Sequence, residues 1–220
     1  MGKKFVEEED RVRVSNLYQY EDDARSQGYK LIAGVDEVGR GSLVGPVLVA
    51  AVILPPDFYF AKLNDSKKIS ARIREKLCEE IKSSAVAYSC AEVSKDEVDD
   101  LNVYQATILG MRRAVAALNP QPDFVLTDAM KVDFDGIENL AIIRGDTLSA
   151  SIAAASIVAK VTRDKLADEW SKIYPQYGFD KNRGYGTKFH RDAIKLLGAT
   201  PIHRKSFNPV KSMLQNKSER

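Results

Sequence analysis

The sequence predicts an α/β fold in which helices cover a sheet. Short apolar segments of strand length alternate with longer segments of helical periodicity along most of the chain. A glycine-rich turn between the first two apolar segments favours a hairpin, and a later strand–helix–strand sequence favours a parallel crossover. The 220 residues suffice for one substantial hydrophobic core.

Five segments of strand length follow in order, at residues 30–36, 47–54, 85–93, 124–128 and 140–143. The first two are apolar and joined by the glycine-rich turn, so they are expected to pair antiparallel. The third alternates and is rich in β-forming residues. A helix separates the third from the fourth, and a right-handed crossover would let these two strands pair in parallel.

Helices are predicted at residues 17–24, 70–81, 101–118, 148–173 and 188–197. Ser70 is a suitable N-cap for the second, and Pro120 stops the third. The fourth is the longest. Its apolar stripe runs from Leu148 to Ile173, and the small residues of its first half would let it lie close to a sheet. The first 28 residues otherwise form a weakly structured lead, and residues 212–220 are expected to be disordered.

Charge is distributed unevenly along the chain. Residues 181–220 carry ten Lys and Arg against two acids, a balance of +8, so with a net charge of +2 the first 180 residues carry −6. A basic segment on an acidic body fits a polyanionic substrate, although a solvated basic tail has the same composition. No apolar run is long enough to span a membrane and the start of the chain has no signal-peptide core, so we expect a cytoplasmic protein.

The chain is organised around Asp36 and Glu37, two adjacent acids at the end of the first strand. Gly39, Arg40 and Gly41 follow directly, and a polar hairpin tip would explain the glycines alone. The glycine spacing is one residue too long for a dinucleotide-binding loop. Gly34 and Gly39 have the spacing of a P-loop, but Arg40 and Gly41 replace the Lys-Ser/Thr that a P-loop requires. A turn with free main-chain N–H groups and one guanidinium suits a phosphodiester or a ribose edge.

Two further acids occupy equivalent places in the predicted fold. Asp128 ends the fourth strand, and Asp146 precedes the longest helix, where it could also serve only as an N-cap. Four carboxylates that converge at strand ends cannot all stay ionised without cations. Two Mg²⁺ or Mn²⁺ ions would compensate them and suit in-line displacement at phosphorus.

Two other stretches suggest contacts with nucleic acid. Ser66 and Lys67 precede a helix and could grip a phosphate, although they could equally mark only the start of that helix. Tyr185 lies between two glycines in a loop rich in aromatic and basic residues. An aromatic ring in such a loop is poorly placed for a core and well placed to stack on a sugar or base.

These motifs, read in order from about residue 30 to 210, resemble bacterial ribonuclease HII of the type 2 ribonuclease H family. The matching stretches are residues 34–41, 45–46, 65–67, 128, 145–146, 155–160, 184–187 and 203–207. The resemblance implies a ribonuclease-H-like fold: a mixed five-stranded sheet flanked by helices, with a small helical C-terminal segment. It implies an N-terminal extension over 1–28, a catalytic domain over 29–178 and a basic segment over 179–220 that completes the substrate cleft.

The resemblance also implies an activity and a site. The expected activity is two-metal hydrolysis of the RNA strand in RNA–DNA hybrids, and incision 5′ to single ribonucleotides in duplex DNA, leaving 5′-phosphate and 3′-hydroxyl ends. Asp36, Glu37, Asp128 and Asp146 would bind the ions. The substrate would contact Gly39, Arg40, Gly41, Ser66, Lys67 and Tyr185, with Tyr185 stacking on the deoxyribose after the ribonucleotide. We expect a monomer that binds RNA–DNA hybrids and DNA duplexes containing ribonucleotides, and that does not bind a membrane.

Two other functions use similar residues. A junction resolvase or strand-transfer nuclease also clusters acids, but it would not need the Gly-Arg-Gly turn or Tyr185. A nucleic-acid-binding module without catalysis would not need four carboxylates. Cleavage of all-DNA substrates would favour the first, and binding without metal-dependent cleavage would favour the second.

Overall fold

The computed structural model describes residues 2–56, 58–63, 66 and 69–218. The chain divides into two compact units. The sheet unit comprises Met1–Glu37, Val49–Ala91 and Met111–Val161, and the helical unit comprises Val38–Leu48, Glu92–Gly110 and Thr162–Arg220. Each unit is described below by itself.

A mixed sheet of five strands forms the centre of the sheet unit, in the order β3-β2-β1-β4-β5. The strands are β1 (Ile32–Val38), β2 (Val47–Ile53), β3 (Ala87–Val93), β4 (Phe124–Asp128) and β5 (Glu138–Ile142). All five predicted strands are present, but the expected parallel pairing of the third with the fourth is wrong. β4 instead pairs in parallel with β1 and with β5, because the connection through α5 carries the chain past β2 and β1 before it rejoins the sheet.

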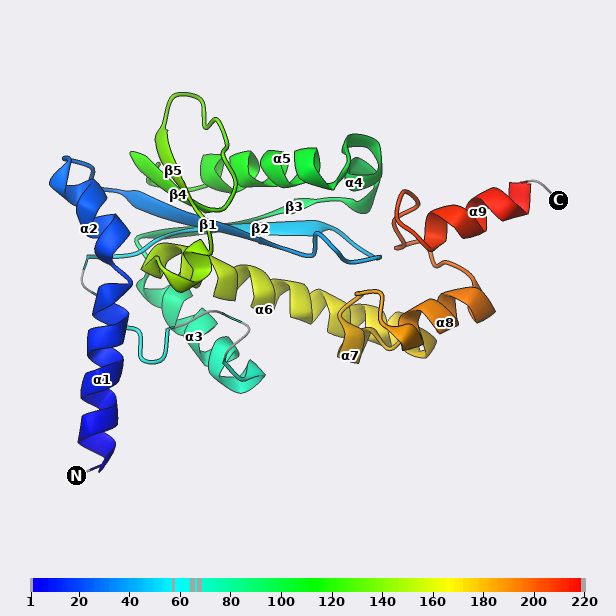
Figure 1. Ribbon diagram of the computed structural model, residues 1–220, viewed down its shortest axis with the longest axis horizontal. Helices are drawn as coiled ribbons and strands as arrows, with labels where there is room; N and C mark the ends of the chain where they lie inside the picture. The colour runs from blue at the N-terminus through cyan, green and yellow to red at the C-terminus, as the bar shows by residue number, and fades with distance from the viewer. Residues whose placement is uncertain (1, 57, 64–65, 67–68, 219–220) are drawn as a thin grey trace. The chain divides into compact units, whose positions relative to one another are not determined.

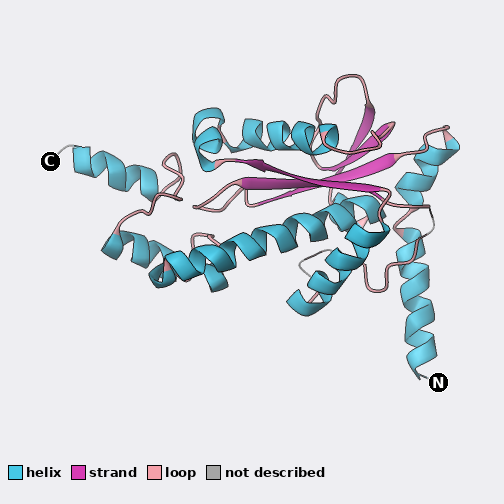
Figure 2. Cartoon of the chain, turned by 180° about the vertical axis from the view of Figure 1, so that it is seen from behind, coloured by secondary structure: helices cyan, strands magenta, loops and turns pink. Residues whose placement is uncertain are grey.

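Helices cover both faces of this sheet (Figures 1 and 2). The end of α5 lies on one face, where the Ser89 hydroxyl of β3 donates to the carbonyl of Ala114 at 2.5 Å. The start of α6 and α3 lie on the other face. The helices are α1 (Gly2–Asn16), α2 (Gln19–Ser26), α3 (Ala71–Ser84), α4 (Lys95–Leu101), α5 (Val103–Ala116), α6 (Ala150–Ile173), α7 (Phe179–Asn182), α8 (Lys188–Leu197) and α9 (Val210–Ser218), with short 3₁₀ turns η1 (Gly145–Thr147) and η2 (Pro175–Tyr177).

The core of the sheet unit depends on a close approach between β1 and α6. Gly34 lies in β1, and a Cβ there would overlap the main chain of Ser151 and Ile152. The small residues predicted for the first half of the long helix therefore serve this contact, since α6 can lie against the strand without intervening side chains. Apolar residues on both sides close the cluster: Ile32, Phe124, Leu126, Ile142 and Ile152.

The N-terminal segment is more ordered than the sequence predicted. Residues 2–26 form two helices rather than a weakly structured lead with one. Leu17 and Tyr18, at the junction of the two helices, are buried, and the Tyr18 hydroxyl donates to the carbonyl of Phe58 at 2.7 Å. The carbonyl of Leu17 accepts from the N–H of Ala150 at 2.9 Å. Tertiary contacts, rather than helical propensity, explain this order.

The helix predicted over 101–118 is α5, and the short helix α4, which was not predicted, precedes it. Asn102 has φ of 69° and ends α4, and its side chain accepts from Tyr104 N at 3.0 Å as α5 begins. The start of α4 is a capping box between Ser94 and Glu97.

The longest helix begins later than predicted. α6 starts at Ala150, and Asp146 lies in the preceding 3₁₀ turn η1 rather than at the helix N-terminus. Arg144, in the left-handed region with φ of 62°, turns the chain from β5 into η1. Leu148 and Ile173, the two ends of the predicted stripe, are exposed.

Aromatic and aliphatic side chains form the core of the helical unit. Its buried members are Leu43, Val44, Tyr177, Phe179, Ala193, Ile194 and Val210. Val210 begins α9, so residues 212–218, which were predicted to be disordered, continue a helix. Within the part of the chain that is described, no helix is long and apolar enough to cross a membrane.

Candidate active site

Asp36 is a buried acid near the end of β1. Its side chain is 6% exposed, and one carboxylate oxygen accepts from the N–H of Glu37 at 2.8 Å. Burial raises the pKa of the Asp36 carboxyl well above its usual range, and the charges of Glu37 and Asp128 raise it further, while a hydrogen bond from Ser156 acts in the opposite direction. Burial and neighbouring carboxylates therefore both disfavour the ionised form of Asp36.

The strand register brings Asp128 beside Asp36. β1 and β4 run parallel with Val35 opposite Thr127, so an acid follows the paired residue in each strand. The apolar stretches Ile32–Val35 and Phe124–Thr127 are buried, which fixes the register and leaves the acids at the strand ends.

Asp146 is connected to these acids through the turn before it. The Asp128 carboxylate accepts from the N–H of Gly145 at 2.8 Å, and Asp146 is the next residue. A Cβ at Gly145 would lie 2.6 Å from Cδ1 of Ile152 in α6, so a larger residue here would displace that side chain. Asp146 itself is buried, so the loop between β5 and α6 carries a second buried acid.

The four predicted acids all belong to the sheet unit and lie in or after the neighbouring strands β1, β4 and β5. Their side chains are not arranged in ion-binding geometry. Among the described residues, no group of three or more His, Cys, Asp or Glu side chains is arranged to hold a metal ion. The Asp36 carboxylate accepts from Glu37 N and from Ser156, which leaves further lone pairs for a cation.

Of the predicted Ser66–Lys67 phosphate contact, only Ser66 can be assessed, because Lys67 lies outside the described residues. Ser66 is buried, and its hydroxyl is 3.0 Å from that of Ser156. Its carbonyl accepts from Arg74 of α3. Ser156 therefore links Ser66 to Asp36 within the sheet unit.

The glycine-rich turn lies in the helical unit, and Gly39 gives it its shape. Gly39 has φ of 90°, and a Cβ there would lie 2.7 Å from Nε of Arg163. Both the conformation and the contact exclude other residues. Only Val38 separates Gly39 from Glu37 in the sequence, so the turn continues directly from the acids.

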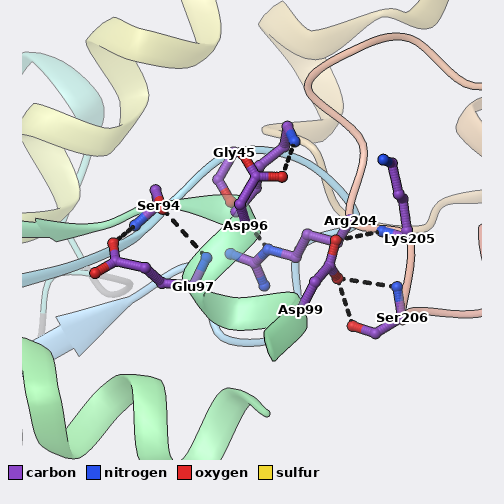
Figure 3. Close-up of polar contacts among 9 residues, drawn as sticks. Gly45, Ser94, Asp96, Glu97, Asp99, Arg204, Lys205 and Ser206 are labelled. Atoms are coloured by element: carbon purple, nitrogen blue, oxygen red, sulfur yellow. Dashed lines mark hydrogen bonds and ion pairs between the residues drawn. The ribbon is translucent and has the colours of Figure 1, made fainter. Parts of the chain in front are cut away.

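Two buried arginines hold the carbonyls of this turn. Arg163 of α6 donates from Nη2 to Val44 O at 2.8 Å and to the Ser42 hydroxyl at 2.9 Å. Arg204 donates from Nε to Gly45 O at 2.9 Å (Figure 3). Its Nη1 donates to Arg40 O, also at 2.9 Å. Burial lowers the pKa of Arg163 to about 10, and burial together with the charge of Arg163 lowers that of Arg204 to about 9, so both remain cations at neutral pH.

Sequence reasoning did not find Arg163, although a signal was present. The residue falls between Ala159 and Leu166 at helical spacing, on the apolar stripe of α6. A charged residue on a buried stripe is unusual and indicates a bonded partner in the core. Its guanidinium also lies over the Trp170 ring, 4.6 Å from the ring centroid.

The segment that carries Arg204 is itself fixed by α4. Asp99 accepts from the main-chain N–H groups of Lys205 at 2.7 Å and Ser206 at 2.9 Å (Figure 3). Partial burial raises the pKa of Asp99, but the Ser206 hydroxyl, which also donates to this carboxylate, and the two main-chain bonds together lower it. The carboxylate therefore anchors the chain next to Arg204 from outside the core.

Tyr185 lies beside the glycine-rich turn, as it must if both are to contact the same substrate. Ser42 and Tyr185 form an antiparallel bridge, and Leu43 N donates to Gly184 O at 2.9 Å. A Cβ at Gly41 would lie 3.8 Å from Cε1 of Tyr185, so the ring is next to a residue without a side chain. The ring remains 40% exposed. The helical unit thus brings together Gly39, Arg40, Gly41 and Tyr185.

Comparison with known proteins identifies the family. The sequence pattern described as Ribonuclease HII matches residues 33–210. The chain belongs to the ribonuclease HII family. A Ribonuclease HII of Listeria monocytogenes serovar 1/2a is 52% identical over 200 residues, which cover 91% of this chain and 76% of that protein. The chain is accordingly a nuclease of the ribonuclease H type, as its motifs predicted.

Solved structures of related enzymes have the same fold. The ribonuclease H2 of Pyrococcus horikoshii OT3 matches with a TM-score of 0.74 at 23% identity, over 87% of this chain and 100% of that one. Bst-RNase HIII, solved in complex with Mn²⁺, matches with a TM-score of 0.65 at 20% identity, over 90% of this chain and 73% of that one. The predicted ribonuclease-H-like fold is therefore confirmed.

Proposed function

We propose that the protein is an endoribonuclease that cleaves the RNA strand of RNA–DNA hybrids and incises duplex DNA 5′ to a single embedded ribonucleotide. Its products would carry 5′-phosphate and 3′-hydroxyl ends, and we infer that it acts as a monomer. The observation that carries the proposal is the register in which Asp36 and Asp128 follow paired residues, with the turn of Asp146 bonded to Asp128. Family membership supports activity on hybrids.

Two divalent cations, Mn²⁺ or Mg²⁺, are the cofactors that we infer, held by Asp36, Glu37, Asp128 and Asp146. The residues fit such ions because carboxylate oxygens are their preferred ligands and because burial, together with the charges of Glu37 and Asp128, raises the pKa of Asp36, a penalty that a bound cation would offset. When bound, the ions would neutralise charge on the phosphate and lower the pKa of the attacking water. A related fold, Bst-RNase HIII, has been solved with Mn²⁺.

The protein's own residues would select the ribonucleotide. Arg40 and the main chain of Gly39 and Gly41 would contact the ribose 2′-hydroxyl, the group that distinguishes RNA from DNA. Tyr185 would stack on the following deoxyribose, and the adjacent Gly41 leaves room for a sugar at its ring.

Ser66 and Lys67 would bind a phosphate of the substrate. The hydroxyl of Ser66 is engaged by Ser156, so a contact between this hydroxyl and a phosphate requires that bond to open.

The decisive experiment uses a DNA duplex with one ribonucleotide, a uniform RNA–DNA hybrid and an all-DNA duplex of the same sequence. Each is incubated with purified protein, with and without Mn²⁺. Metal-dependent cuts 5′ to the ribonucleotide, with 3′ ends that a polymerase extends, are expected, and the all-DNA duplex should stay intact. Cleavage of all-DNA duplex would favour a junction resolvase, and binding without cleavage would favour a non-catalytic module.

A further inference from the structure

Two histidines that take no part in the acid site are buried together in the helical unit. His190 lies in α8 and His203 in the segment before Arg204, and the first has no exposed surface while the second has 2%. Their Nε2 atoms are 3.1 Å apart. The rings of Tyr177 and Phe179 surround the pair, with ring centroids 5.2 to 6.3 Å from those of the histidines. Water is therefore excluded from the pair.

The hydrogen bonds assign one proton position to each ring. Thr200 N donates to Nδ1 of His203 at 2.9 Å, so this nitrogen carries the lone pair and Nε2 carries the proton. His203 Nε2 then donates to Nε2 of His190, which leaves the His190 proton on Nδ1. That nitrogen donates to the carbonyl of Tyr185 at 3.0 Å. The bonds form one directed chain from Thr200 N to Tyr185 O.

Both rings have to be neutral for this chain to exist, and the surroundings favour that state. Burial lowers the pKa of His203 to about 4, with a further contribution from His190, and burial also lowers the pKa of His190. A second proton on either ring would set two N–H groups against each other.

The chain ends on the residue whose ring is exposed beside the glycine-rich turn. Tyr185 N donates to Asn182 O at 2.9 Å, and Tyr185 O accepts from Thr187 N at 2.8 Å in addition to His190. The main chain of Tyr185 is thus held from several sides while its ring stays open to solvent. This is the arrangement that a preorganised stacking surface needs.

We propose that His190 and His203 are positioning residues that hold the main chain of Tyr185, so that its ring is oriented beside Gly41 for the sugar next to the ribonucleotide. The inference rests on the proposed function and extends it to substrate selection. A uniform RNA strand offers no deoxyribose after the scissile ribonucleotide. Positioning of Tyr185 should therefore affect cleavage of the single-ribonucleotide duplex and not of the uniform hybrid.

The test compares His190→Leu, which removes the donor, with His190→Asn, whose amide replaces Nδ1–H. Values of kcat and KM are measured with Mn²⁺ on the single-ribonucleotide duplex and on the uniform hybrid. His190→Leu should lower kcat/KM about tenfold on the single-ribonucleotide duplex and less than about twofold on the uniform hybrid. The reason is that only the first substrate offers the deoxyribose that the Tyr185 ring contacts. His190→Asn should recover most of the kcat/KM that His190→Leu loses on the single-ribonucleotide duplex.

A double-mutant cycle separates positioning from general stability. In a Tyr185→Ala background, His190→Leu should not change the ratio of the two kcat/KM values further. An equal loss on both substrates, or a further change of the ratio in that background, would overturn the proposal. If Tyr185→Ala leaves the ratio unchanged, the positioning proposal is wrong while cleavage of the hybrid still supports the nuclease activity.

A measurement on the wild-type protein guards against a variant that does not fold. Ring ¹⁵N chemical shifts near pH 7 should report a proton on Nδ1 of His190 and on Nε2 of His203. The opposite tautomer at either residue would break the chain to Tyr185 and refute the proposal. His203→Gln, which keeps a donor near Nε2, provides a second variant for the kinetic comparison and should resemble His190→Asn.

Discussion

Arg204 donates from Nη1 to the main-chain carbonyl of Arg40 at 2.9 Å. The same guanidinium donates from Nε to Gly45 O, so one buried cation bonds two carbonyls of the glycine-rich turn, those of Arg40 and Gly45. Arg163 holds the carbonyl of Val44 between them. The shape of the turn therefore depends on two arginines as well as on its glycines, and the sequence places these arginines far from it.

Arg204→Lys should weaken the turn while preserving the charge. A single ammonium cannot donate along the two directions that the guanidinium fork uses, so at least one buried carbonyl would lose its partner. We expect the free energy of unfolding to fall by about 1 to 3 kcal/mol in urea denaturation. Lys205→Met is the matched control, because Lys205 is exposed and bonds Asp99 only through its main chain. Equal midpoints for the two variants would contradict the expectation.

The sequence was sufficient for the features that repeat locally. Apolar runs located all five strands, and the acids that end two of them, Asp36 and Asp128, occupy equivalent positions in neighbouring parallel strands. Ser70 caps α3 as predicted, accepting from Ile73 N at 3.4 Å. Each of these depends on residues only a few positions apart, which is the range over which a pattern can be read.

The features that were missed depend on contacts between distant segments. Arg163 lies on the apolar stripe of α6, where a charge is tolerated because the guanidinium bonds the turn around Val44. That turn is about 120 residues earlier in the sequence. The order of the N-terminal helices comes from contacts with the start of α6, and β4 joins β1 rather than β3. Periodicity cannot reveal such partners, since it records only which face of an element is apolar.

Glu21 provides a test of the contact between the N-terminal helices and α6. Its side chain is 1% exposed, and Oε1 accepts from the Ser149 hydroxyl at 2.6 Å and from Ser151 N at 2.9 Å. Glu21→Ala should lower the free energy of unfolding by about 1 to 3 kcal/mol because these donors lose their acceptor. The exposed neighbouring variant Asp22→Ala should cost less than about 1 kcal/mol. Thermal and urea unfolding of both variants would measure this, and similar losses would refute it.

Asp146→Asn should separate binding from turnover. The substitution keeps the size of the side chain and removes its charge, so the fold and hybrid binding should persist while kcat falls by about a thousandfold or more. Asp192→Asn is the control, because Asp192 is an exposed acid of α8 paired with Lys188. Fluorescence anisotropy with a labelled hybrid reports binding, and single-turnover cleavage reports chemistry. Undiminished cleavage would remove Asp146 from the site.

Mn²⁺ should stabilise the protein through the acids. Binding to the folded state alone adds about 2.7 kcal/mol when the ion is at 100 times its Kd, so the melting temperature should rise with Mn²⁺ concentration. Asp36→Asn should abolish most of this rise, yet without Mn²⁺ the variant should be at least as stable as the wild type because it removes a buried charge. Differential scanning fluorimetry with and without EDTA tests both expectations. A full Mn²⁺ response in the variant would show that Asp36 is not a ligand.

The histidine pair predicts a loss of stability toward acid pH. Burial lowers the pKa of folded His203 to about 4, below the usual 6.5 of an imidazole, so the unfolded chain takes up a proton first as the pH falls. The stability that neutral His203 contributes to the free energy of unfolding is fully present above pH 6.5 and is lost progressively as the pH falls toward 4. The loss amounts to about 3 kcal/mol. His203→Gln lacks this titration, so the difference in unfolding free energy between wild type and variant should narrow over that interval. A difference that stays constant from pH 7 to pH 4 would mean that His203 is protonated, or free to titrate normally, in the folded protein.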